Sequence, residues 1–167
     1  VSITAMLNAF SAWWHMLGVL FIVFVLIIVP DHHRSIGYVF GQTINNTGFG
    51  GGKTSGFIFF YVFLTGLLMA QYTITGYDAS AHMSEETRRA SIGAAWGMVM
   101  SVVVSVIFGF LLLVAVTFVV PNDKDASGAG TYIVTYIWQT SMSTHWAEIL
   151  LFVAVLAQVF CTIASVT

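Results

Sequence analysis

Four long stretches of this chain are almost free of charged side chains. They cover about residues 7–29, 57–83, 96–120 and 146–167. A helix needs roughly 20 apolar residues to cross the hydrocarbon core of a bilayer. Each stretch is therefore predicted to be one membrane-crossing helix, which makes four crossings in the chain.

The composition agrees with a membrane protein. Hydrophobic residues make up 58% of the sequence and charged residues only 7%, whereas about a quarter of the residues are charged in an ordinary soluble domain. A soluble fold of this length could not bury so much apolar surface beneath a polar exterior. We predict an all-α integral membrane protein with several crossings. We expect it in the plasma membrane, in contact with membrane lipid.

Charge, cysteine content and residue spacing exclude several other classes of protein. The net charge of -2 provides no basic surface for nucleic acid. The single cysteine, Cys161, rules out an internal disulfide and a paired-cysteine metal site. Ser80 and His82 are too close in sequence to face each other on a helix, so no nucleophile–base pair indicates an enzyme. We predict no enzymatic activity, no cofactor and no nucleic acid partner.

The second apolar stretch is predicted to be a broken helix. A straight helix from Phe57 to Glu86 would measure about 45 Å, against a hydrocarbon core of about 30 Å. Three β-branched residues and a glycine, all poor helix formers, follow one another at Thr73, Ile74, Thr75 and Gly76. We expect the break near residues 73–77. Irregular backbone at membrane depth persists where it lines a cavity or is buried in protein, and interrupted spans hold substrate sites in many transporters.

A polar motif follows the predicted break. Asp78, His82 and Glu85 share one face of a helix, which raises the question of a metal site, and Glu86 follows them. The motif has no second histidine, and the arginine pair at 88–89 can neutralise the glutamates. A solvated helix end explains these residues better, and no metal is predicted.

His15 lies inside the first apolar stretch. An ionisable side chain within a span is costly and therefore indicates a functional role by default, and histidine changes its charge near neutral pH. A neutral histidine that is hydrogen-bonded to a neighbouring helix would also account for its position. Both interpretations remain open from the sequence.

Small and polar side chains mark two of the later stretches. Small residues recur at every fourth position along the third stretch and so share one helical face, at Gly93, Gly97, Ser101, Ser105 and Gly109. Such a stripe permits close contact between helices, and helix packing is its simplest explanation. The last stretch carries polar or small side chains at Gln158, Cys161, Thr162 and Ser165. Packing explains these too, with ion or substrate contact as the alternative.

The run Gly76–Thr87, which reads Gly-Tyr-Asp-Ala-Ser-Ala-His-Met-Ser-Glu-Glu-Thr, resembles the amino acid permeases of the amino acid–polyamine–organocation (APC) superfamily. The similarity is greatest to the amino acid/choline transporter group. Three further stretches resemble that group in order and spacing, namely 13–15, 45–49 and 157–161. The resemblance covers nearly the whole chain, and a run of twelve positions is highly specific.

The resemblance implies a transporter fold and a transport activity. The family has twelve spans, of which the first ten form two inverted five-helix repeats (5+5). This chain would hold spans five to eight, with residues 84–95 in the cytoplasm. The chain begins at Val1 and ends at Thr167 within an apolar run, so we also expect a fragment that works with the missing spans of its own chain. The expected activity is secondary active transport of an amino acid or related amine by alternating access.

The resemblance also implies roles for particular residues. In the family, backbone carbonyls at the broken helix receive the substrate's amino group, and an aromatic residue before the break gates the pocket. The aromatic residue matches Tyr72, and the break matches Thr73, Ile74, Thr75 and Gly76. The half of the site that binds the carboxylate lies in the first span, outside this chain. The motif of Asp78, His82, Glu85 and Glu86 falls on the cytoplasmic half-helix.

Coupling to an ion is implied at His15. In related permeases a lysine of span five occupies the place of a sodium ion and takes part in proton coupling, and its position matches His15. A protonated His15 would supply a similar positive charge, so protons and sodium ions are both candidates. The alternative to transport is a binding-only or scaffold membrane protein with a degenerate transporter fold.

Overall fold

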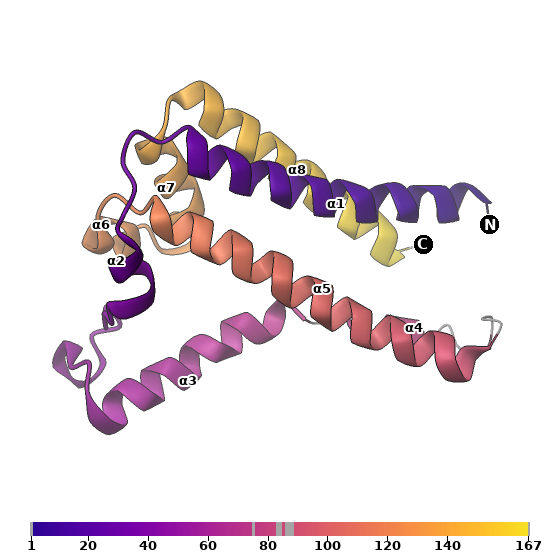
Figure 1. Ribbon diagram of the computed structural model, residues 1–167, viewed down its shortest axis with the longest axis horizontal. Coiled ribbons are helices and arrows are strands. Elements are labelled where there is room, and N and C mark those ends of the chain that lie inside the picture. Colours follow the sequence, from indigo (N-terminus) through magenta and orange to yellow (C-terminus); the bar gives the residue numbers. More distant parts are fainter. Residues whose placement is uncertain (1, 75, 83–84, 86–88, 167) are drawn as a thin grey trace. The chain divides into compact units, whose positions relative to one another are not determined.

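The computed structural model describes residues 2–74, 76–82, 85 and 89–166. The described residues form helices joined by turns, and no strand occurs among them (Figure 1). They divide into two units, Val1–Gln42 with Leu111–Thr167, and Thr43–Phe110. Helix α5 (Ala90–Phe118) begins in the second unit and ends in the first.

Two long helices of the first unit, α1 (Ser2–Ile28) and α8 (Thr144–Val166), pack side by side. A Cβ atom added to Gly18 of α1 would lie 3.2 Å from a methyl carbon of Val153 in α8. The glycine therefore lets the two helices approach closely. Further along the same interface, the ring of Phe10 meets that of Phe160 edge-on at 5.1 Å between centroids.

The core of the first unit lies where α1 and α8 meet the end of α5 and the loop helix α7 (Ile133–Ser141). The side chains of Leu26 and Leu150 are fully buried there. Helix α6 (Asp123–Gly128) and the short 3₁₀ helix η2 (Gly130–Tyr132) lead into α7. Helix α7 packs against this core through Ile137 and Trp138, so the loop between α5 and α8 is an ordered part of the unit.

Arg34 ties the loop after α1 to the carboxyl end of α5. Its backbone N–H donates to the carbonyl of Phe118 at 2.7 Å. Its guanidinium donates from Nε to the carbonyl of Val120 at 2.9 Å and from Nη2 to that of Pro121 at 2.7 Å. The last carbonyls of a helix lack intrahelical donors and carry partial negative charge. The backbone N–H of Arg34 thus satisfies the last carbonyl of α5, and its guanidinium places a positive charge on two carbonyls of the turn just beyond it.

Two further side chains complete this cluster, which we call the Arg34 clasp. The guanidinium carbon of Arg34 lies 4.7 Å from the ring centre of Tyr38 in α2 (Ile36–Gly41). The hydroxyl of Tyr38 donates to the carboxylate of Asp123, which also lies 3.9 Å from Arg34 Nη2. Partial burial, and then the hydrogen bond to Asp123 and its charge, raise the pKa of the Tyr38 hydroxyl, whereas the nearby Arg34 charge opposes this effect. The clasp joins α2, α5 and α6.

The second unit contains α3 (Gly56–Tyr72), the short α4 (Ala79–His82) and the larger part of α5. A glycine-rich 3₁₀ turn, η1 (Phe49–Gly52), precedes α3. The ring of Phe49 packs on that of Tyr61 at 5.0 Å between centroids. Gly50 has φ 64° and sits directly on Ile58, because a Cβ there would come within 2.6 Å of it. The side-chain amide of Asn45 donates to the carbonyls of Phe49 and Lys53 and closes this turn.

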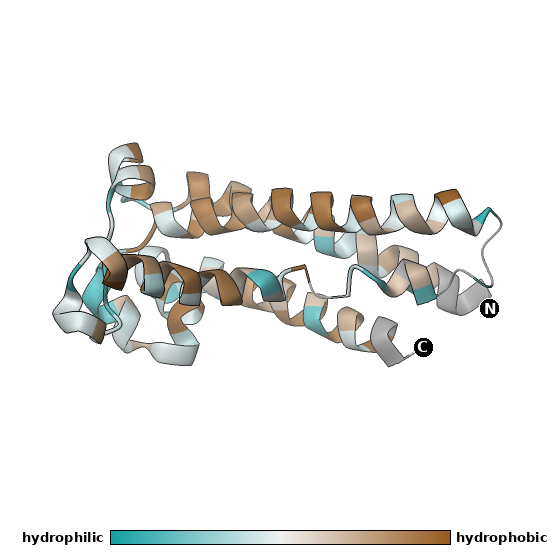
Figure 2. Cartoon of the chain, turned by 90° about the horizontal axis from the view of Figure 1, so that it is seen from below, coloured by the Kyte–Doolittle hydropathy of each residue, from teal (hydrophilic) through white to brown (hydrophobic). Residues whose placement is uncertain are grey.

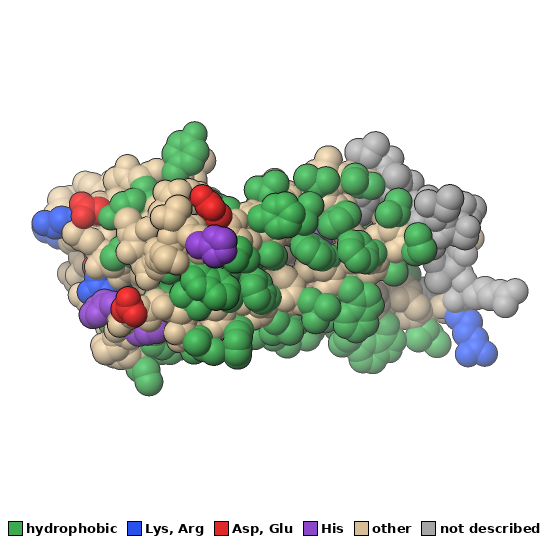
Figure 3. All heavy atoms as spheres, turned by 90° about the horizontal axis from the view of Figure 1, so that it is seen from above, with side chains coloured by type: hydrophobic (Ala, Val, Ile, Leu, Met, Phe, Trp, Pro, Cys, Tyr) green, Lys and Arg blue, Asp and Glu red, His purple; other side chains and the backbone are tan. Residues whose placement is uncertain are grey.

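Three of the described helices are long and apolar enough to cross a membrane, at Met6–Ile28, Ser91–Phe118 and Thr144–Ile163. Figure 2 shows their hydrophobic residues in brown, and Figure 3 shows how hydrophobic side chains spread over the face in view. Large apolar side chains such as Phe24 and Leu113 remain more than 60% exposed. The predicted all-α, multi-pass membrane fold is confirmed.

The bounds of two predicted spans differ from those of the helices in the structure. The apolar part of α3, Gly56–Leu68, is shorter than the three candidate spans. A membrane crossing by this segment therefore stays a prediction. Helix α5 begins at Ala90, ahead of the expected start of its span at Trp96. Three of the six residues in this interval are alanines, which favour a helix whether or not they are inside the membrane.

Candidate functional site

Helix α3 ends where the run of β-branched residues begins. Tyr72 is its last residue, and Thr73 is the C-cap, with φ -65° and ψ -27°. The N–H of Thr73 donates to the carbonyl of Ala70, and that of Ile74 to Gln71, both at 3.1 Å. These bonds reach back three residues instead of four, which tightens the last turn as a helix closes. The helix therefore stops at the expected place.

Gly76 turns the chain after this helix end. Its φ of 89° lies in the left-handed region, and no atom lies within 4 Å of the place where its Cβ would be. Only the backbone conformation therefore requires glycine here, since residues with a Cβ rarely adopt this φ. The carbonyl of Gly76 then accepts from the N–H of Ala79 at 3.1 Å, where α4 begins. The break between α3 and α4 thus contains an irregular stretch that includes Thr73, Ile74 and Gly76.

The carboxyl end of α3 has the electrostatic character of a cation site. Aligned peptide dipoles give a helix C-terminus about half a negative charge, which favours a bound cation. The carbonyls of Ala70 and Gln71 point out of this end toward the turn that follows. Thr75 lies outside the described residues, as does the side chain of Tyr72. The proposed five-residue set is described in part, and its role in binding stays a prediction.

The break rests against α5. A Cβ added to Gly109 of α5 would lie 3.0 Å from the Cγ2 methyl of Thr73. Gly109 is the last member of the stripe of small residues, so this end of the stripe contacts the break itself.

The motif after the break is only partly brought together. In α4, His82 Nε2 lies 3.4 Å from Asp78 Oδ2, and the two side chains are 78% and 54% exposed. Glu85 is exposed in a turn, and Glu86 lies outside the described residues. Within the described part of the chain, no three histidine, cysteine, aspartate or glutamate side chains gather as metal ligands would. Asp78 and His82 form an exposed pair one helical turn apart, as on a solvated helix end.

His15 occupies a different unit from the break. It is half-buried in α1, and its Nδ1 lies 2.7 Å from the carbonyl oxygen of Ser11 in the same helix. A carbonyl oxygen only accepts, so Nδ1 is the ring nitrogen that carries a proton. The partner of Nδ1 is the helix's own backbone instead of a neighbouring helix.

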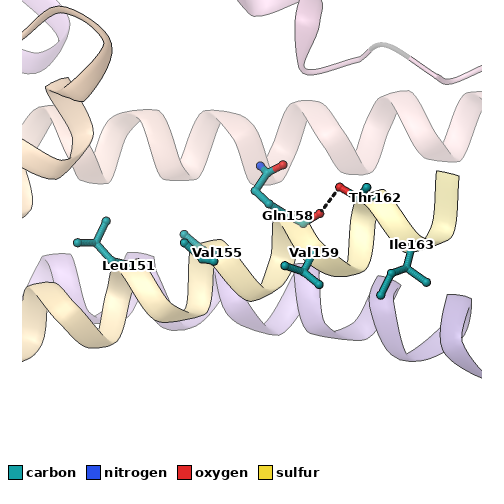
Figure 4. A pocket seen from close by; sticks show the side chains of 7 residues that line it. Leu151, Val155, Gln158, Val159, Thr162 and Ile163 are labelled. Carbon is teal, nitrogen blue, oxygen red and sulfur yellow. Dashed lines mark hydrogen bonds between the residues drawn. The ribbon is translucent and has the colours of Figure 1, made fainter. Parts of the chain in front are cut away.

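Two grooves on the first unit involve residues outside the break. An open groove of about 450 Å³ runs along α8, where aliphatic side chains flank Gln158 and Thr162 (Figure 4). The hydroxyl of Thr162 donates to the carbonyl of Gln158 at 2.9 Å. The exposed side-chain amide of Gln158 requires a polar partner or water, since an unpaired polar group in lipid is costly.

The second groove is aromatic and lies between α1 and α8. It measures about 280 Å³ and is lined by Phe10, Trp13, Trp14, Leu17, Gly18, Phe21 and Val153. The signal for it was present in the sequence, because positions 10, 13, 14, 17 and 21 repeat at the spacing of one helical face. The pattern could not show that α8 would supply the opposite wall.

Comparison with known proteins gives a consistent family match. The sequence profile of the amino acid permease family matches residues 1–167. The amino-acid permease BAT1 of Arabidopsis thaliana is 32% identical over 176 residues, which cover 100% of this chain and 33% of that protein. The BAT1 homolog of Oryza sativa subsp. japonica is 33% identical over 169 residues, covering 95% of this chain and 31% of that protein.

A third relative is similar over a shorter stretch. The thiamine transporter thi9 of Schizosaccharomyces pombe is 49% identical over 49 residues, which are 29% of this chain and 8% of that protein. No solved structure matches the chain. The chain spans about a third of the length of the two plant relatives.

Proposed function

This chain belongs to the amino acid permease family, and on that premise we propose that its full-length protein is a secondary active transporter. The substrate is an amino acid or a related amine, carried across the plasma membrane by alternating access. The chain supplies spans five to eight of a fold built from two inverted repeats. The observation that carries the proposal is the break after Tyr72, where helical structure is interrupted in a largely apolar chain.

The break receives the amino group of the substrate. An ammonium group is a cation with several N–H donors, so it is suited to the partial negative charge and the carbonyl oxygens at the carboxyl end of α3. The backbone of Thr73, Ile74, Thr75 and Gly76 forms this half of the pocket, and the ring of Tyr72 closes it. The carboxylate half belongs to a span outside this chain.

The break also allows the two halves of the helix to change their relative direction. Gly76 has a left-handed φ and no Cβ, so its backbone has a wider range of allowed torsion angles than that of other residues. Helices α3 and α4 are separate segments on either side of it. A change at this point would open the site to one side of the membrane while it closes the other.

His15 couples transport to an ion. Its Nδ1–H is held by the carbonyl of Ser11, so protonation at Nε2 switches a positive charge on or off within a span. The charged form would take the place of a sodium ion, and the neutral form would not. Proton coupling is therefore the first candidate and sodium coupling the second.

Uptake by the purified full-length protein in proteoliposomes tests the site. A panel of radiolabelled amino acids, amines and thiamine identifies the substrate. We expect Tyr72→Ala and Gly76→Leu each to lower uptake at least about tenfold, with unchanged expression. Gly66→Ala in α3, where a Cβ also meets open space, serves as the control. Normal uptake by both site variants would show that the break is not the substrate site.

Two further measurements separate the remaining possibilities. His15→Ala is expected to change the pH dependence of uptake, and an unchanged pH profile would remove His15 from coupling. A protein that binds substrate but shows neither uptake nor counterflow exchange would be the binding-only or scaffold membrane protein.

A further inference from the structure

Gly109 stands where a helix would ordinarily favour a different residue. It lies within α5, nine residues from the end of that long apolar helix at Phe118. Glycine within a helix is less stable than alanine, because it loses more backbone freedom on folding. At Gly66 in α3 no atom lies within 4 Å of an added Cβ, whereas at Gly109 the added Cβ meets Thr73 at 3.0 Å. The absence of a side chain at Gly109 therefore serves a close contact.

The partner in that contact is the residue at which α3 ends. Thr73 is the C-cap of α3; its N–H donates to the carbonyl of Ala70, and the next N–H, that of Ile74, donates to the carbonyl of Gln71. The contacting atom, Cγ2, is attached directly to Cβ, and the branched side chain has few rotamers to escape into. A Cβ on Gly109 would push Thr73 by a few tenths of an ångström. That displacement would reach the carbonyls at the end of α3.

We propose that Gly109 is a positioning residue for the substrate site at the break. Its bare backbone lets α5 lie against Thr73 and holds the end of α3 at the depth where its carbonyls meet the substrate's amino group. Gly109 does not touch the substrate. The inference rests on the proposed transport function, and it adds a residue of α5 to a site otherwise assigned only to the broken helix.

The positioning role and helix propensity predict different effects of Gly109→Ala on transport. Gly109→Ala improves the propensity of α5, so a purely structural role of the glycine in α5 predicts unchanged or higher stability and unchanged transport. If Gly109 positions the break, Gly109→Ala raises KM instead. Thr73→Ser removes the Cγ2 methyl while it keeps the hydroxyl. In the Gly109→Ala background it should therefore bring KM back to the value of Thr73→Ser alone, because the atom that the new Cβ meets is gone.

The experiment compares five forms of the full-length protein in proteoliposomes, with the substrate found by the uptake panel. They are the wild type, Gly109→Ala, Thr73→Ser, the double variant, and Gly66→Ala as the matched control. We expect Gly109→Ala to raise KM about fivefold to tenfold, since sub-ångström misplacement in a binding site is costly. Gly66→Ala should stay within about twofold of the wild type, and the double variant should stay within about twofold of Thr73→Ser alone.

A cysteine pair checks the contact separately from the kinetics. Gly109→Cys with Thr73→Cys, in a Cys161→Ser background, should form a disulfide under mild oxidation, because a Cβ on Gly109 would lie 3.0 Å from Cγ2 of Thr73, a position that a cysteine sulfur can occupy. Gly66→Cys with Thr73→Cys should not. Mass spectrometry of the linked peptides detects the product.

The outcomes distinguish the two proposals. Wild-type uptake together with equal KM values for Gly109→Ala and Gly66→Ala would overturn the positioning role alone. The same fold rise in KM on adding Gly109→Ala to Thr73→Ser as on adding it to the wild type, or no cross-link, would overturn it as well. A wild-type protein that takes up no member of the panel would overturn the transport function, and the positioning role with it.

Discussion

The two units of this chain hold their shape by different means. The first unit has a buried core around Leu26 and Leu150, and the Arg34 clasp fastens its loops to helix ends. In the described part of the second unit, Ala94 is the only buried hydrophobic side chain. Capping bonds and left-handed glycines define the turns there instead. Side-chain packing resists displacement, whereas a turn defined by torsion angles can change without disrupting a packed core. The candidate substrate site lies in the unit that can change more easily.

The largest expected effect tests the core of the first unit. Leu26→Ala should lower the stability of the full-length protein by about 2 kcal/mol or more, because a fully buried leucine leaves a cavity. Leu68→Ala in α3, where the side chain is 67% exposed, is the matched change in the second unit and should cost less than half as much. Unfolding in detergent measures both. Equal losses would mean that the remaining spans bury α3 as deeply as α1.

The Arg34 clasp should give the next largest effect. Arg34→Ala removes two side-chain hydrogen bonds and the ion pair with Asp123. We expect a loss of about 1–3 kcal/mol, the range for hydrogen bonds that involve a charged group. Arg34→Lys keeps the charge but not the planar set of donors, so it should recover only part of this loss. Lys53→Ala, where only the carbonyl makes a described contact, is the control. Full stability of Arg34→Ala would show that the clasp does not hold the first unit together.

The sequence predicted the long helices well and the clasp not at all. Apolar length alone located α1, α5 and α8, and the run from Thr73 to Gly76 located the end of α3. These features depend on neighbours in sequence. Arg34 instead donates to backbone carbonyls more than eighty residues away. Every residue has a backbone carbonyl, so the sequence does not mark which ones Arg34 will reach.

The candidate site shows the same limit. Gly109 was visible as one member of a stripe of small residues, but the stripe could not show that Thr73 would lie against it. The role of Gly109 thus depends on Thr73, a residue outside the helix that carries the stripe. The substrate-binding role of Tyr72, Thr73, Ile74, Thr75 and Gly76 and the coupling role of His15 remain predictions.

A smaller effect with a defined pH dependence is expected at Tyr38, which lies in the loop between spans. The raised pKa means that the hydroxyl stays protonated and bonded to Asp123 in the folded protein. Its stabilising effect is complete below the unfolded value of about 10 and is lost as pH rises through the higher folded value. Tyr38→Phe should cost about 0.5–1.5 kcal/mol at pH 8, and less above pH 10.

Thermal unfolding of wild type and Tyr38→Phe between pH 8 and 11 measures this difference. Tyr61→Phe in the second unit is the control, because its described contact is between rings and does not use the hydroxyl. A constant gap between wild type and Tyr38→Phe across this range would contradict the role of the ionising hydroxyl.

The smallest effect is expected in the second unit, at the exposed pair of Asp78 and His82. Both side chains are more than half exposed, so solvent screens their interaction. Asp78→Asn should change stability by less than about 0.5 kcal/mol, and the change should shrink further in high salt. Unfolding in low and high salt measures it. A loss as large as that of Arg34→Ala would mean that the second unit depends on its charges as much as the first.

The closed turn around Asn45 has a consequence for covalent modification. Asn45-Asn46-Thr47 matches the acceptor pattern for N-linked glycans, in which the sugar replaces a hydrogen on the side-chain amide nitrogen. That nitrogen donates to two backbone carbonyls, those of Phe49 at 3.1 Å and Lys53 at 2.9 Å. A primary amide has only two such hydrogens. A sugar attached there would displace one of these bonds, so the folded turn and a glycan at Asn45 exclude each other.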